Sequence, residues 1–207
     1  MKLVRWESLS TAETLARLRR VRLKGLGEPL VYADAALSLE RAVAPTSLAP
    51  AQRYVLKADL ENVLALAGLF EEKEIDIFAL EGVILFWLDQ NDEGPIPLAP
   101  PVVEESREAD GRRLWLINDG MHRVTAARRL GRSINILLAR GVPEAWPYYA
   151  LPLPGGWDEV EEIPALPAGY QKKTYRWPQE YKALFRDFNA VFPSIQKQRP
   201  APSETSP

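Results

Sequence analysis

The spacing of apolar residues predicts a helix near the beginning of the chain. Apolar side chains recur at helical intervals from Leu15 to Val21, and Ser10 with Glu13 forms a capping-box pattern just before them. Two glycines shortly after Val21 end the run. We therefore expect a helix over residues 11–24, and we interpret the arginines on its other face as a solvated surface.

Helical periodicity returns in the second quarter of the chain. From Leu56 to Ala67 the apolar residues share one helix face, which predicts a second helix. Before it, residues 28–53 contain three prolines and short apolar pieces, so we expect loops there with one brief strand around residues 30–32. Residues 71–88 fit either a buried helix or a central strand, and periodicity alone does not decide between them.

Two short apolar segments joined by a turn dipeptide predict a β-hairpin. Residues 102–106 and 113–117 flank Asp110 and Gly111, a dipeptide that accepts the positive φ angles of a tight turn. The second arm runs without a gap into a glycine turn at residues 118–123. A short helix over residues 124–130 and an alternating strand over 133–139 follow. The unit is therefore strand, turn, helix, strand.

The last third of the chain is rich in proline and aromatic residues. Residues 142–177 predict a long ordered loop or a lid, because large rings usually need something to pack on. Pro178 suits the first position of a helix, and the apolar residues from Tyr181 to Phe188 predict a final amphipathic helix. We expect residues 200–207 to be a disordered tail.

Composition excludes several kinds of chemistry. The 207 residues include no cysteine and one histidine, so a disulfide scaffold, a thiolate nucleophile and a multi-histidine metal cage are ruled out. The net charge of -2 gives no general attraction to nucleic acid or anionic membranes. The first ten residues show no secretory signal, and the most apolar window, residues 75–88, is too short to cross a bilayer. We expect a cytoplasmic protein without a membrane span.

The glycine turn carries the candidate chemistry. A helix amino terminus leaves backbone N–H groups without helical partners and carries partial positive charge, so it is a natural phosphate site. Gly120 allows close approach, Arg123 offers a forked contact to an anion, and His122 donates or exchanges a proton near neutral pH. The alternative interpretation is structural: Asp119 caps the helix, Gly120 makes the turn, and the other two residues lie on the surface.

This turn also carries a resemblance to a known family. Residues 116–131, which include the sequence Asp119-Gly120-Met121-His122-Arg123, resemble the signature of the ParB/sulfiredoxin superfamily. In that superfamily a strand ends in a D-G-x-H-R, G-G-C-H-R or G-E-R-R turn, followed by an alanine-rich helix and another strand. The resemblance implies a small mixed sheet surrounded by helices.

The resemblance also implies the roles of the site residues. Members of the superfamily include CTP-binding partition proteins, ATP-using sulfiredoxins and nucleotide-dependent free-serine kinases, and the D-G-x-H-R spelling is nearest to the kinases. It implies that the backbone N–H groups of Gly120, Met121 and His122 bind nucleotide phosphates together with the side chains of His122 and Arg123. Asp119 would touch a magnesium-bound water and serve as the metal residue.

Two departures from the superfamily narrow the function. Met121 stands where sulfiredoxin needs its cysteine, so this chain cannot perform that sulfinate repair. The helix-turn-helix domain and the longer arginine-rich box of the partition proteins have no counterpart, which argues against centromere-type DNA binding.

Glu104 and Glu105 are the candidates for a general base or a magnesium ligand. Neighbouring strand residues face opposite ways, so at most one of the two faces the turn, and a solvated carboxylate is the ordinary alternative for either.

These inferences combine into one expectation. We expect an α+β protein of the ParB/sulfiredoxin fold with a nucleotide-binding domain over residues 1–141, an extension packed on it over 142–199, and the tail. The expected function is binding of ATP, ADP or CTP with Mg²⁺ for phosphoryl transfer or hydrolysis, with His122, Asp119 and Glu104 as catalytic candidates and an unidentified acceptor. The alternative is a non-catalytic DNA- or protein-binding module, in which a basic segment over residues 170–200 provides the contacts and a nucleotide acts as the switch. A nuclease is a third hypothesis, but the sequence shows no evident carboxylate cluster for the paired metals that it would need.

Overall fold

The structure is a computed structural model that describes residues 2–25, 27–89 and 94–192. In this part of the chain the α-helices are α1 (Thr11–Leu18), α2 (Lys57–Glu71) and α3 (Met121–Arg129). The strands are β1 (Leu3–Ser8), β2 (Arg22–Lys24), β3 (Ala36–Val43), β4 (Tyr54–Leu56), β5 (Ile84–Leu88), β6 (Ile96–Leu98), β7 (Val102–Arg107), β8 (Arg113–Asp119), β9 (Ile134–Arg140), β10 (Glu161–Ile163) and β11 (Phe185–Asp187). The expected α+β class is confirmed. No helix among these residues is long and apolar enough to span a membrane.

A four-stranded mixed sheet forms the centre of the molecule. Its strand order is β3-β9-β7-β8, with β7 parallel to β9 and the two outer pairs antiparallel. β9 is buried along nearly its whole length, as a continuous apolar run in a sheet covered on both faces should be. The predicted hairpin is confirmed as β7 and β8, which place Glu105 opposite Trp115.

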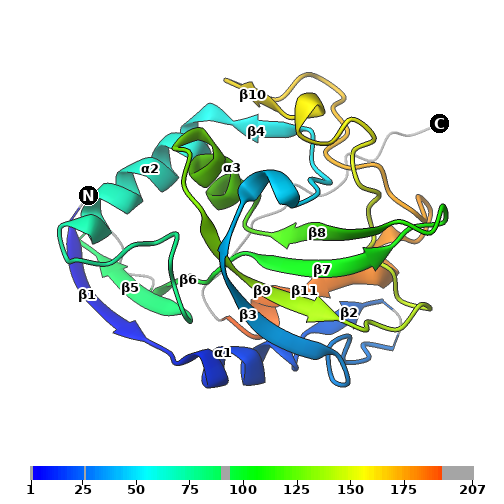
Figure 1. Cartoon of the computed structure of the whole chain (residues 1–207), viewed down its shortest axis with the longest axis horizontal. Coiled ribbons are helices and arrows are strands. Elements are labelled where there is room, and N and C mark those ends of the chain that lie inside the picture. Colours follow the sequence, from blue (N-terminus) through cyan, green and yellow to red (C-terminus); the bar gives the residue numbers. More distant parts are fainter. Residues whose placement is uncertain (1, 26, 90–93, 193–207) are drawn as a thin grey trace.

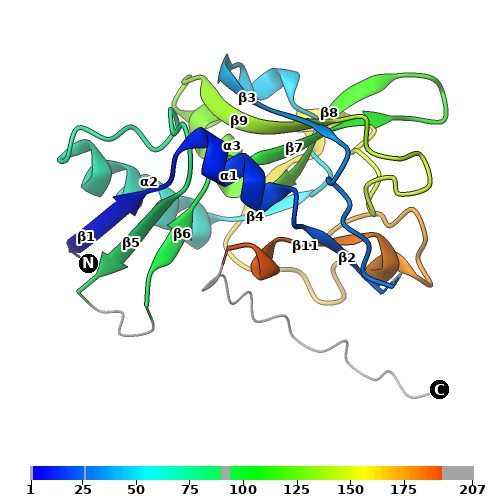
Figure 2. The same cartoon turned by 90° about the horizontal axis from the view of Figure 1, so that it is seen from below.

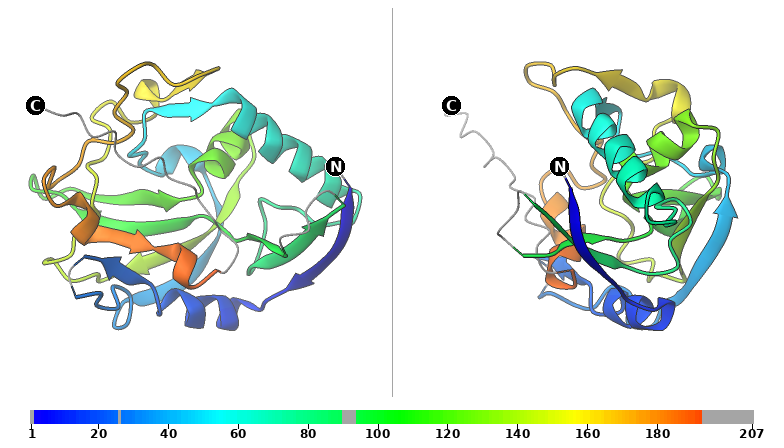
Figure 3. Two further views of the ribbon diagram at one scale, coloured as in Figure 1. Left: turned by 180° about the vertical axis from the view of Figure 1, so that it is seen from behind. Right: turned by 90° about the vertical axis from the view of Figure 1, so that its left-hand side faces the viewer.

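Two cores cover the faces of this sheet. Ile136 and Leu138 of β9 point into a core that α2 and α3 complete, whereas Leu137 points into a second core with α1 and β2. Figure 1 shows α2 and α3 on one side of the sheet and α1 on the other, and Figure 3 shows the same layers from behind and from the side. The alternation along β9 therefore assigns each helix to its face.

A separate antiparallel sheet of β1, β5 and β6 extends from the central sheet, as Figure 2 shows. It resolves the ambiguity over residues 71–88: α2 ends at Glu71, a loop follows, and Ile84–Leu88 is a strand. The sequence analysis did not predict β1, which pairs with β5 far along the chain and leaves most of its residues exposed. Far-apart segments thus meet here, since Ser8 pairs with Ile84.

Four expected elements need correction. The first helix is shorter than expected, because residues 22–24 pair as β2 with β11. Residues 36–43, expected as loop, form edge strand β3 beside β9, whereas the brief strand expected around 30–32 is reduced to an isolated bridge between Arg22 and Leu30. The predicted final helix is wrong: residues 181–190 form two short 3-10 turns around β11.

The physical reason for the last correction is the side chain of Arg186. Strand alternation sends Arg186 into the interior while Phe185 and Asp187 face the other way, which a helix would not do. The long loop before it packs on the sheet through Tyr148 and Tyr149, which are buried against Leu116. The expected tail at residues 200–207 lies outside the described residues, and the division of the chain at residue 141 stays a prediction.

Candidate functional site

The predicted turn joins the end of β8 to the beginning of α3. Gly120 precedes the helix with φ +86°, a left-handed conformation that strongly favours glycine. A Cβ atom built on Gly120 would lie 2.9 Å from Cβ of Pro101 and 2.8 Å from Nη2 of Arg123. Gly120 therefore meets two requirements at once, the backbone angle and the close approach.

Arg123 lies beneath this turn. Its guanidinium donates to the carbonyl oxygen of Ala99, and its Nη2 lies 3.1 Å from Oδ2 of Asp119. Only 12% of the Arg123 side chain and 20% of the Asp119 side chain are exposed. Burial lowers the pKa of the Arg123 guanidinium, and the charge of Asp119 opposes that shift. The pair links the end of β8 to the first turn of α3, so Arg123 holds the turn in shape.

His122 lies on the outer side of the turn and faces α2. Its Nε2 is 3.5 Å from Oδ2 of Asp59, and 30% of the His122 side chain is exposed. Asp59 belongs to the first turn of α2, as His122 belongs to the first turn of α3. The amino ends of two helices therefore meet at this point, and both contribute partial positive charge. Sequence reasoning found His122 but had no signal for Asp59.

Glu104 is buried in a network behind the turn. Both of its oxygens bind Arg186, at 2.7 Å from Nε and 2.9 Å from Nη2, and Tyr32 and Asn118 also donate to it. Glu105 points the other way and lies 3.6 Å from Arg113, so only one of the two carboxylates faces inward, as expected. The alternative of a solvated carboxylate does not apply to Glu104, which is buried and has its charge compensated by a buried guanidinium. Since its oxygens are occupied, the geometry does not support a general-base role for Glu104.

The network reaches the turn through Asn118. Its Nδ2 donates to Glu104 and to the hydroxyl of Tyr32, and its backbone oxygen accepts from the hydroxyl of Tyr148. Asn118 directly precedes Asp119, so the buried charges fix the end of β8. Sequence analysis counted Arg186 only as one cation of the basic segment over residues 170–200, because its pairing with Glu104 depends on the fold.

Residues that would hold a metal are few. Among the described residues, no group of three or more histidines, carboxylates or cysteines is placed to hold an ion. Asp119, the predicted metal residue, has its Oδ2 in contact with Arg123. This arrangement does not fit a dedicated magnesium site. It fits only an ion held mainly by phosphate oxygens, with one or two protein carboxylates.

Comparison with known proteins gives one match. The family model of the ParB CE domain matches residues 13–161, which include both helices at the site and the whole central sheet. No curated protein and no solved structure is similar enough to the chain to be matched. The match covers well over half of the chain and agrees with the resemblance that the turn carries.

Proposed function

Because the chain belongs to the ParB CE domain family, we propose that the amino end of α3 binds the phosphates of a nucleotide. The proposed donors are the backbone N–H groups of Gly120, Met121 and His122, at the amino end of α3. The imidazole of His122 adds a side-chain donor. Arg123 supports the site from below, where its charge also favours an anion.

The observation that carries this proposal is the meeting of two helix amino ends at a preformed glycine turn. Gly120 is held by Pro101 and Arg123, so the turn does not have to be ordered when the ligand binds. Preorganisation matters because ordering a loop on binding costs free energy that would otherwise contribute to affinity. The partial positive charge at the amino end of α3 adds to the same effect.

Magnesium enters the proposal only with the nucleotide. A Mg²⁺ ion that keeps several waters and binds phosphate oxygens needs one or two carboxylates from the protein, and Asp119 is the candidate. The ion would neutralise phosphate charge when bound. The residues of this chain bind and orient the phosphates.

Titration calorimetry of the full chain with ATP, ADP, CTP and GTP, with and without Mg²⁺, tests the proposal. We expect at least one nucleotide to bind, and His122→Ala to weaken its binding about tenfold through loss of a charge-assisted contact. Arg129→Ala is the matched control, because Arg129 lies at the other end of α3 and pairs with Glu162. Absence of binding for every nucleotide, or equal losses in both variants, would contradict the proposal.

Phosphoryl transfer or hydrolysis is the second candidate, and the pairing of His122 with Asp59 favours it. A carboxylate beside an imidazole orients the ring and stabilises its protonated form, as proton transfer at a phosphate site requires. Release of inorganic phosphate from the bound nucleotide, with and without small alcohol acceptors, measures this activity. We expect Asp59→Asn to lower the rate while nucleotide affinity stays nearly unchanged. A rate that is zero in the unaltered protein rules this candidate out and leaves binding alone.

DNA binding is less well supported. In the predicted basic segment, Lys173 lies between the hydroxyls of Tyr148 and Tyr149 at 2.6 and 2.8 Å, and Arg186 is buried against Glu104. Arg176 is paired with Glu108 at 2.7 Å. Cations that are already paired inside the protein cannot neutralise a DNA backbone without breaking those contacts.

A further inference from the structure

Strand β1 forms an open edge of the sheet of β1, β5 and β6. The strand order places β1 at the edge of this sheet, and Figures 1 and 3 show it at the outer side of the molecule. Of its six residues, all but Leu3 are exposed. Among the described residues, no strand pairs with its outer side, so the backbone groups on that side can pair with a further strand.

Two other sheet edges carry features that hinder strand pairing, and β1 has neither of them along most of its length. Strand β6 is three residues long and contains Pro97, and β3 is bent by a register shift and a positive φ at Ala42. The irregularity in β1 lies at its beginning, between Leu3 and Arg5, and the residues from Arg5 to Ser8 pair regularly with β5. The second half of β1 is therefore a straight, accessible edge.

The hydrogen bonds to β5 show which backbone groups of β1 face outward. The N–H of Leu9, directly after the strand, donates to the oxygen of Val83 at 2.7 Å, in the register that pairs Arg5 and Glu7 with β5. In an antiparallel pair, residues that exchange hydrogen bonds alternate with residues that do not. The backbone groups of Arg5 and Glu7 therefore point toward β5, whereas the N–H and carbonyl groups of Trp6 point away from it.

The side chains at this edge form a symmetrical pattern of charge. Arg5 and Glu7 flank Trp6 and pair with each other, although 61% and 51% of their side chains are exposed. Such an exposed pair opens at little cost. Trp6 itself is 39% exposed. When the strand is reversed, the positions of the two charges are exchanged, so a second β1 that runs antiparallel presents a negative charge to each positive one.

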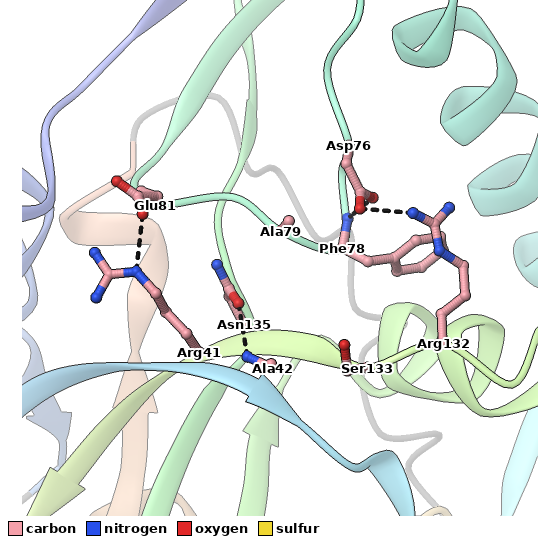
Figure 4. A pocket seen from close by; sticks show the side chains of 9 residues that line it. All are labelled: Arg41, Ala42, Asp76, Phe78, Ala79, Glu81, Arg132, Ser133 and Asn135. Carbon is pink, nitrogen blue, oxygen red and sulfur yellow. Dashed lines mark hydrogen bonds and ion pairs between the residues drawn. The ribbon is translucent and has the colours of Figure 1, made fainter.

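The loop that leads into β5 ties this sheet to the rest of the molecule. Asp76 of the loop pairs with Arg132 at 2.6 Å, and Glu81 pairs with Arg41 at 2.8 Å, across a cavity of about 430 Å³ (Figure 4). The backbone oxygen of Glu81 also accepts from the hydroxyl of Thr11, in α1, at 2.6 Å. The edge is thus formed before any partner arrives, which spares an association the free-energy cost of ordering it.

We propose that β1 pairs antiparallel with β1 of a second copy of this chain, about a two-fold axis at Trp6. The N–H of Trp6 donates to the carbonyl oxygen of Trp6 in the second copy, and the reverse bond forms by symmetry. Each Arg5 then lies opposite Glu7 of the second copy. A shift of two residues in either direction would place Arg5 opposite Arg5, or Glu7 opposite Glu7, and like charges directly opposite destabilise a strand pair.

Sedimentation equilibrium of the full chain, with any affinity tag at the carboxyl end, tests this proposal. We expect a dimer that forms reversibly below millimolar concentration. Arg5→Glu and Glu7→Arg should each weaken dimerisation at least tenfold, because like charges then face each other across the axis. An equimolar mixture of the two variants should recover the affinity of the unaltered protein. Recovery cannot come from the pair within one strand, since each variant chain still carries two like charges there.

Two further variants complete the test. Trp6→Pro removes an N–H that does not bond to β5, so it should abolish the dimer while circular dichroism shows a folded chain. Arg107→Glu is the matched control, because Arg107 forms an exposed pair with Glu144 on the opposite side of the molecule (Figure 1), and it should leave dimerisation unchanged. A monomer up to millimolar concentration, unchanged dimerisation in Arg5→Glu, equal weakening in Arg107→Glu, or a mixture that stays monomeric would overturn the proposal.

Discussion

Gly120 is the residue on which the shape of the glycine turn depends most directly. Its positive φ and its contacts with Pro101 and Arg123 act together, so a side chain at this position meets both backbone strain and steric overlap. Gly131, at the other end of α3, has a similar angle, φ +63°, but nothing lies within 4 Å of a Cβ atom built there. The two glycines therefore separate the cost of the angle from the cost of the contact.

We expect Gly120→Ala to lower the free energy of unfolding by about 2–4 kcal/mol, and Gly131→Ala by about 1 kcal/mol. The first variant suffers strain and overlap, and the second suffers strain alone. Urea denaturation followed by circular dichroism measures both values. Equal losses would show that Pro101 and Arg123 move aside freely, and that the turn is not held as the structure indicates.

Tyr32 predicts a pH dependence of stability. Burial and the neighbouring charge of Glu104 raise the pKa of its hydroxyl well above the usual value. In the unfolded chain a tyrosine loses its proton near pH 10, at which the folded protein still holds it. The unfolded state then binds fewer protons, so the free energy of unfolding falls as the pH rises above about 10.

Denaturation curves between pH 8 and pH 11 test this effect with Tyr32→Phe as the comparison. The variant should be less stable at pH 8 by about 1–3 kcal/mol, because Glu104 loses a hydrogen bond. Its stability should then decline less steeply with rising pH than that of the unaltered protein. Parallel curves would indicate that the Tyr32 hydroxyl reaches solvent.

The sequence indicated which residues form the glycine turn, but not where their side chains point. Asp119, Gly120, His122 and Arg123 do form one turn, as their pattern predicts. The inward direction of Arg123 depends on Ala99, which reaches the turn only through the fold. Side-chain direction of this kind is a tertiary property, and no local pattern encodes it.

Among the elements, β11 shows how one short strand is held by one side chain. Arg186 binds both oxygens of Glu104 on β7 and donates to the backbone oxygens of Trp146, Pro147 and Leu184. Burial lowers the pKa of the guanidinium, but the charge of Glu104 outweighs that effect and raises it. Arg186 thus fixes β11, and the loop that contains Trp146 and Pro147, to strand β7.

We expect Arg186→Ala to cost about 3–5 kcal/mol of unfolding free energy, because it leaves the Glu104 carboxylate buried without its counter-charge. Combining it with Glu104→Gln removes that charge. The double variant should therefore be more stable than the sum of the single losses implies, by about 1–3 kcal/mol. A double-mutant cycle in guanidinium chloride measures this coupling, and additive losses would contradict the described pairing.

Elements that local pattern governs were predicted well. The hairpin of β7 and β8, helix α2 and strand β9 follow from periodicity and turn residues alone. β11 was predicted as a helix because its apolar residues also fit a helical face, and the choice depends on pairing with β2 and on the partner of Arg186. Edge strand β3 was missed for a similar reason, since its hydrogen bonds come from distant β9.

For the whole molecule, charge balance decides which polyanions are suitable partners. The net charge is -2, and several cations of the predicted basic segment are paired internally. We expect no retardation of duplex DNA by the full chain at physiological salt in a gel-shift series. Tight binding that weakens steeply as salt rises would contradict this expectation and restore the DNA-binding alternative.

The order of the strands has a consequence for how the chain reaches its native state. Lys24 cannot complete its pairing until Phe185 has been synthesised, and Ala36 must similarly wait for Arg140. Contacts between residues so distant along the chain slow folding, because the intervening segment loses its freedom before the contact forms. A ribosome-bound chain that stops before β11 would leave β2 and the carboxylate of Glu104 without their partners. Such an intermediate is a natural substrate for chaperones and proteases.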